Sequence, residues 1–167
     1  MNTINQPILS KKQNFWLVIK FILFSASAGL IQFVSFALLD NFTHLDELTN
    51  LEEFFGNDYG LTYFIALILS VLWNFTFNRK FTFKSATNVP IAMLKVFAFY
   101  LVFTPLSIWW GVELTNIGWN YYIVLLGTML INLTTEFLYD RYVVYRKSLY
   151  TNQAGQRELL EKHGNNT

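Results

Sequence analysis

Four long apolar stretches alternate with polar segments along the chain. They cover residues 15–39, 61–83, 93–114 and 121–145. Each has about 20 residues or more, enough for a helix to cross about 30 Å of hydrocarbon. Because backbone polar groups in lipid must be satisfied within their own segment, each stretch is predicted to be a transmembrane helix. The alternative, a soluble helical protein, would have too little polar surface to cover four such helices.

The polar segments divide the chain around one transmembrane domain, residues 15–147. Residues 1–14 precede it, and a polar tail, residues 148–167, follows it and is expected to be mobile. An acidic loop, residues 40–60, separates the first two apolar stretches, and its "HLDELTNLEEFF" predicts a short amphipathic helix on the membrane surface. The basic start and the Ala-Ser-Ala that follows resemble a signal peptide. Lys20 interrupts that apolar stretch, however, and the run continues to Leu39, which favours a retained helix.

The basic residues are distributed unevenly about these stretches. The net charge is only +1, but every Lys and Arg lies at the start of the first helix, around the junction of the second and third, or at and after the end of the fourth. The loop between the first two helices is acidic instead. The positive-inside rule therefore predicts that both termini are cytoplasmic.

The second and fourth stretches repeat each other without a gap. "WNFTFNRKFTFK" (73–84) aligns with "TEFLYDRYVVYR" (135–146) at a register of 62 residues. The aligned polar and basic pairs are Ser70 with Asn132, Asn74 with Glu136, Asn78 with Asp140, Arg79 with Arg141, and Lys84 with Arg146. The first and third stretches align more weakly at a register of 75, with Lys20 on Lys95, Ser25 on Tyr100 and Gln32 on Ser107. The alternative is chance similarity between apolar stretches. The pattern predicts an all-α integral membrane protein of four transmembrane helices, built as two parallel-repeated helical hairpins.

Polar residues form stripes along these helices. In the second and fourth stretches a spacing of four places the polar residues on one helix face, and in the first stretch Ser25, Gln32 and Ser35 lie roughly on one face. The stripe residues proposed to line a polar cavity are Gln32, Ser70, Asn74, Asn78, Asn132, Glu136 and Asp140. Polar faces in lipid turn toward each other or toward a wet cavity. The alternative is that Asn and Ser act only as hydrogen-bonding contacts between helices, each worth about 0.6 kcal/mol.

The basic residues beside these stripes suggest a site for an anion. A carboxylate at the depth of Glu136 must be protonated, hydrated or paired, and Arg79 and Arg141 are its expected partners. The residues predicted to bind a lipid phosphate are Arg79, Arg141, Lys20 and Lys95. The alternative is that these bases simply reach the headgroups from the helix ends.

Other chemistries find little support in the sequence. There is no Cys, the two His residues are far apart, and we see no metal-binding constellation or Gly-rich phosphate loop. No nucleophile–base pair suggests an enzyme. We expect no cofactor, no metal and no nucleic-acid partner.

The sequence resembles the GtrA-like family of small four-helix membrane proteins over about residues 20–146. The strongest match is the Asn-Phe-x-x-Asn-Arg-x-x-x-Phe core at Asn74, Phe75, Asn78, Arg79 and Phe83. The opening of the first helix, "KFILFSASAGLIQF", is also similar. The family often has Asp at the position of Gln32, and Asn is more usual at the positions of Glu136 and Asp140, so the charge of the cavity departs from the family pattern.

The resemblance implies translocation of an undecaprenyl-phosphate-linked monosaccharide from the inner to the outer leaflet of a bacterial cytoplasmic membrane. The sugar would serve glycosylation of a cell-surface polysaccharide or teichoic acid, in partnership with a membrane glycosyltransferase. One alternative is a non-transporting subunit that anchors or regulates such a glycosyltransferase. Another is a small cation or drug exporter with Glu136 as counter-charge, which fits poorly with the nearby bases. A homodimer or larger assembly would suit so small a bundle.

Overall fold

The computed structural model describes residues 7–43 and 60–164, and these form helices and turns without a strand. The helices are α1 (Lys11–Thr43), α4 (Gly60–Phe77), α5 (Val89–Asn116), α6 (Tyr121–Tyr139) and α7 (Gln153–Gly164). Two π-helical turns, η1 (Asn78–Thr82) and η2 (Asp140–Val144), extend α4 and α6. All four predicted apolar segments are thus helical. The amphipathic helix expected within residues 40–60 lies outside the described residues.

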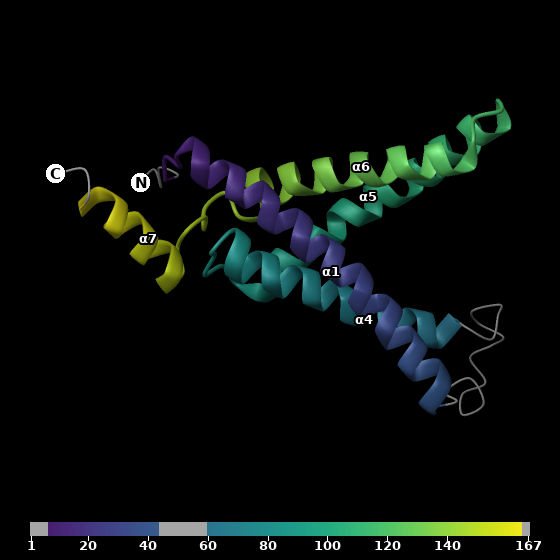
Figure 1. The fold of residues 1–167 in the computed structure, drawn as a ribbon, viewed down its shortest axis with the longest axis horizontal. Coiled ribbons are helices and arrows are strands. Elements are labelled where there is room, and N and C mark those ends of the chain that lie inside the picture. Colours follow the sequence, from purple (N-terminus) through teal and green to yellow (C-terminus); the bar gives the residue numbers. More distant parts are fainter. Residues whose placement is uncertain (1–6, 44–59, 165–167) are drawn as a thin grey trace.

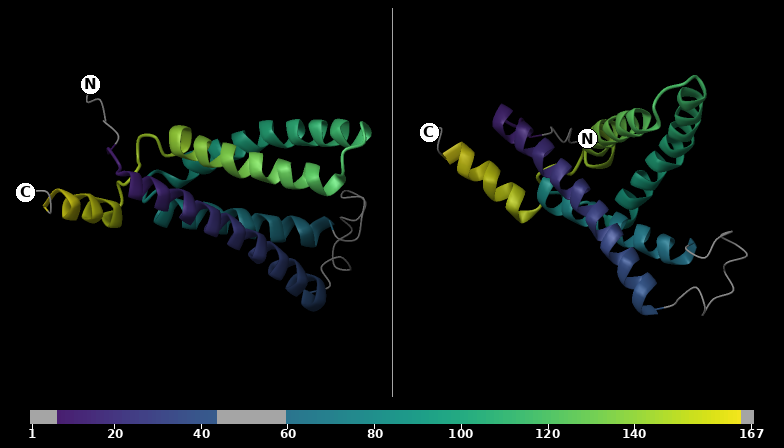
Figure 2. Two further views of the ribbon diagram at one scale, coloured as in Figure 1. Left: turned by 45° about the horizontal axis from the view of Figure 1, so that its top comes forward. Right: turned by 45° about the vertical axis from the view of Figure 1, so that its right-hand side comes forward.

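The helices pack as two pairs that meet at one end. Figure 1 shows α1 beside α4 and α5 beside α6, and both views in Figure 2 show the pairs diverging toward the far end. The pairs meet where α1 and α5 begin and where η1 and η2 end. We call this the basic end, because Lys20, Arg79, Lys95 and Arg141 lie on the helical turns near it.

Three of the described helices are long and apolar enough to cross a membrane. They cover residues 11–42, 89–116 and 121–144. Large apolar side chains such as Phe33, Leu94 and Ile108 are exposed along them, as expected of lipid-facing surfaces. The chain is therefore a membrane protein. That α4, with its 18 residues and the five of η1, forms a fourth span stays a prediction, as does the orientation of the termini.

The buried core lies at the basic end and is largely aromatic. The Phe83 ring stacks on Tyr145 with centroids 4.6 Å apart, and Phe21 meets Phe83 edge-on at 6.1 Å. All three side chains are fully buried. Each comes from a different element, so this cluster joins α1 to the ends of both hairpins.

Residues 148–164 are folded, which corrects the expectation of a mobile tail for the described part of that segment. Leu149 and Tyr150 are buried in the core cluster. The Tyr150 N–H donates to the Phe83 carbonyl at 2.9 Å, and the Asn152 N–H donates to the Lys84 carbonyl at 2.9 Å. The tail is polar on average, but these backbone hydrogen bonds and two apolar side chains dock it against the basic end, and α7 follows.

Gly155 brings the first turn of α7 close to the chain before it. A Cβ at this position would lie 2.7 Å from the Tyr150 Cα, closer than real Cβ contacts come. We therefore expect Gly155→Ala to loosen α7 and to speed tryptic cleavage after the exposed Arg157 several-fold. Gly127→Ala is the matched control, because its Cβ would meet nothing within 4 Å. Equal cleavage of the two variants would contradict the close approach.

Candidate functional site

The two π-helical turns lie at equivalent positions in the repeat. Adding 62 to the bounds of η1, residues 78–82, gives those of η2, residues 140–144. Their i→i+5 hydrogen bonds also correspond, from the Phe83 N–H to the Asn78 carbonyl at 2.9 Å and from the Tyr145 N–H to the Asp140 carbonyl at 2.8 Å. Single π turns are rare and are frequently found at functional sites. Their recurrence at this register supports a duplicated hairpin.

Two pairs of equivalent residues contact each other directly. The Asn74 Nδ2 donates to the Glu136 Oε1 at 3.4 Å, and Phe83 stacks on Tyr145. Both pairs are 62 residues apart. A residue meets its own counterpart only close to a two-fold axis, as at a self-complementary interface. These contacts therefore place the pseudo-two-fold axis between η1 and η2, through the polar stripes.

The weaker register of 75 also agrees with the contacts. The Ser25 hydroxyl on α1 donates to the Asn74 Oδ1 at 3.3 Å. Tyr100 on α5, the counterpart of Ser25, makes a side-chain hydrogen bond with Glu136, the counterpart of Asn74. In each hairpin, therefore, equivalent residues of the first and second helices form a hydrogen bond.

The stripe of the first hairpin is internally hydrogen-bonded. The Asn78 Nδ2 donates to the Asn74 Oδ1 at 2.7 Å, and the Thr82 hydroxyl donates to the Asn78 Oδ1 at 2.8 Å. Ser70 is buried but donates to the Leu67 carbonyl of its own helix. Thr82 is not among the predicted site residues, although it continues the same spacing of four. The polar side chains of this stripe therefore largely satisfy one another along their own helix.

The stripe of the second hairpin keeps unpartnered buried atoms. Among the described residues, the Asn132 Oδ1 and the Asp140 Oδ1 have no hydrogen-bond partner. The Tyr145 hydroxyl, which lies near Asp140, has none either. A buried polar group without a partner is costly. A ligand or a water molecule bound here could form hydrogen bonds with these atoms. Most such groups of the described residues lie on α6, on η2 or at its end, and the first hairpin contributes one, the Arg79 Nε.

The expected pairing of Glu136 with Arg79 or Arg141 is wrong. In the described part of the chain, one ion pair forms, and it joins Lys84 to Glu158. Glu136 is buried against Asn74 and Tyr100 instead. At 100° per residue, Arg141 is rotated about 140° around the helix from Glu136, so it faces another side.

Arg79 and Arg141 occupy matching places in η1 and η2. The Arg79 Nη1 donates to the Ser85 carbonyl at 3.5 Å, and the Arg141 Nη2 donates to the Asn14 Oδ1 at 2.6 Å. The Nε atom of each is buried and has no hydrogen-bond partner among the described residues. Two equivalent guanidinium groups with an unused donor each suit an anion such as phosphate.

The other predicted residues are spread more widely. The Lys95 Nζ donates to the Val143 carbonyl of η2 at 3.2 Å. Lys20 lies in electrostatic range of Lys84 and Glu158. Gln32 is half-buried on α1, seven residues beyond Ser25, and the structure does not bring it into the network around Asn74. The four bases thus share the basic end without converging on one point.

A sequence model of the GtrA/DPMS transmembrane domain matches residues 20–145. The match covers most of the chain, and the chain therefore belongs to the GtrA/DPMS transmembrane-domain family. This family comprises membrane proteins related to polyprenyl-phosphate-linked sugars and is generally non-catalytic. No curated protein and no solved structure matches the chain.

Proposed function

We propose that this protein moves a polyprenyl-phosphate-linked monosaccharide from the inner to the outer leaflet of a bacterial cytoplasmic membrane. The basic end then faces the cytoplasm, and the sugar goes to a surface polysaccharide or teichoic acid. The observation that carries the proposal is the pair of equivalent arginines, Arg79 and Arg141, each with a buried and unpartnered Nε. Family membership supports a lipid of this class.

The side chains have distinct roles in this proposal. Arg79 and Arg141 bind the phosphate where the two hairpins meet, and Lys20 and Lys95 attract it from nearby. The unpartnered acceptors of Asn132 and Asp140 take hydrogen bonds from sugar hydroxyls. The prenyl chain stays in lipid, against exposed apolar helix surfaces.

The test is reconstitution in liposomes that hold undecaprenyl-phosphate-linked sugars in the inner leaflet. The measurement is the rate at which the sugar becomes accessible to an impermeant outside reagent. We expect the wild type to exceed protein-free liposomes for at least one sugar. No increase across several sugars would overturn the proposal and favour a non-transporting subunit, which would then copurify with a membrane glycosyltransferase.

A further inference from the structure

Lys84 is held in an unusual conformation beside α7. Its backbone is left-handed, with φ of 48°, which is uncommon for a residue with a side chain. Its Nζ forms an ion pair with the Glu158 carboxylate and lies 5.1 Å from the centre of the Tyr150 ring. The Asn152 N–H binds the Lys84 carbonyl. Groups of the tail therefore hold both the backbone and the ammonium group of Lys84.

The Glu158 carboxylate is bound through both oxygens by groups of the bundle. Lys84 binds the Oε2, and the Gln13 Nε2 on α1 donates to the Oε1 at 3.0 Å. Lys20 lies in electrostatic range of the same carboxylate. Two bases and an amide donor around one anion also suit a phosphate group.

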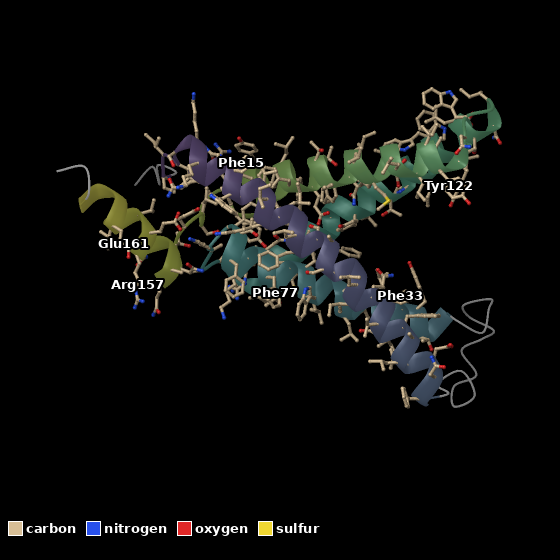
Figure 3. All side chains as sticks on the ribbon, viewed as in Figure 1. Phe15, Phe33, Phe77, Tyr122, Arg157 and Glu161 are labelled. Carbon is tan, nitrogen blue, oxygen red and sulfur yellow. The ribbon has the colours of Figure 1, made fainter. Side chains whose placement is uncertain are left out.

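In the ion pair between Lys84 and Glu158, the glutamate is the less buried partner. The Lys84 side chain is 12% exposed, whereas the Glu158 side chain is 36% exposed on a peripheral helix of 12 residues. Figure 3 shows Arg157 and Glu161 of the same helix pointing away from the bundle. Because one face of α7 is open, the helix can leave while the bases stay in place.

The bases also adjoin the proposed phosphate site. Arg79 donates to the carbonyl of Ser85, the residue after Lys84. The loop that carries Lys84 is therefore also bound by the guanidinium group of Arg79.

We propose that Lys20, Lys84 and Gln13 form a site for the phosphate group of a membrane lipid, which we call the rim site, and that Glu158 occupies it in the absence of lipid. Binding of the phosphate displaces Glu158, releases α7 and opens the way to Arg79. The inference rests on the proposed function and adds a step before it. The phosphate comes either from a polyprenyl phosphate or from the headgroup of a bulk anionic phospholipid.

The electrostatics of Glu158 agree with this exchange. Burial by itself raises the pKa of this carboxyl, but hydrogen bonds from Lys84 and Gln13 and the charges of Lys84 and Lys20 outweigh it and lower the pKa below the ordinary value. The contact is therefore complete above the ordinary glutamate pKa and is lost as the pH falls through the lowered value. Tyr150, the other titratable group here, has its pKa raised to about 12, chiefly by burial and then by the Glu158 charge, so it stays neutral over that range.

The position of α7 can be measured directly, because the chain has no cysteine. Spin labels on Leu160→Cys and Ile91→Cys, both exposed, report the distance from α7 to the start of α5 by double electron–electron resonance. In phosphatidylcholine nanodiscs we expect one narrow distribution. Undecaprenyl phosphate and, separately, phosphatidylglycerol at equal mole fraction are then added. A second, longer distribution with either lipid supports the rim site and identifies the source of the phosphate, and no change with either overturns it.

Variants separate this inference from the proposed function. Glu158→Gln is expected to show the longer distribution without added lipid and to flip lipid-linked sugar about two- to fivefold faster, the range for loss of a partly exposed ion pair. Gly155→Ala should act in the same direction. Glu161→Gln, an exposed acid on the same helix, is the matched control and should behave as the wild type. A wild type that flips lipid while Glu158→Gln is no faster would overturn the rim site and leave the proposed function standing.

Discussion

Arg79→Ala is expected to slow lipid translocation by about ten- to a hundredfold at limiting lipid concentration. Its buried Nε has no partner among the described residues, so a bound phosphate would receive a charge-assisted hydrogen bond from it. Loss of such a bond costs about 1.5–3 kcal/mol, and each 1.4 kcal/mol is a factor of ten. The measurement is the rate at which sugar becomes accessible outside liposomes of matched protein content.

The structure provides a matched control for this variant. Lys80 is the next residue in the same π turn but is exposed, so Lys80→Ala should stay close to the wild-type rate. Arg79→Lys keeps the charge but loses the planar donors and should fall between the two. Equal rates for Arg79→Ala and Lys80→Ala would show that the guanidinium group does not bind the phosphate.

The helices could be predicted closely from the sequence, because apolar stretches of membrane length permit few other structures. The third helix begins at Val89 rather than at the predicted residue 93. The Asn88 side chain caps this earlier start by accepting a hydrogen bond from the Ile91 N–H at 3.3 Å, and Pro90 fits the first turn. Such cap residues move a helix end without changing hydropathy.

The repeat predicted equivalence but not contact. A register of 62 pairs Asn74 with Glu136 whether they lie 3 Å or 30 Å apart, since it says nothing of where the symmetry axis passes. The proposed ion pairs of Glu136 failed for a related reason. Charges close in sequence can face different sides of a helix, and only the packing shows which neighbours fill each face.

The docked tail gave almost no signal in the sequence. Its contacts are single interactions with residues far away in the chain, such as Glu158 with Lys84 and with Gln13. Leu149 and Tyr150 are too few to make an apolar window. The mean hydropathy of the tail is therefore polar, although Leu149 and Tyr150 at its start are buried and most of α7 is exposed.

Phe83→Ala is expected to lower the free energy of unfolding by about 3–5 kcal/mol, the range for truncation of a buried aromatic side chain. Phe83 is fully buried and meets Tyr145, Phe21 and Phe137, so its removal leaves a cavity among three rings. The measurement is reversible unfolding in mixed micelles of increasing dodecyl sulfate content. Phe81→Ala is the control, because Phe81 lies in the adjacent π turn but is exposed, and we expect a much smaller loss.

A double-mutant cycle with Tyr145→Ala tests the symmetry itself. Phe83 and Tyr145 are counterparts in the repeat and stack at 4.6 Å, so their coupling should be about 0.5–1.5 kcal/mol. Strict additivity would mean that the rings do not pack on each other. The ring contact would then no longer support a pseudo-two-fold axis between η1 and η2, nor the proposal that Arg79 and Arg141 bind one phosphate. Coupling within the expected range would instead support direct packing of the two hairpins through these equivalent rings.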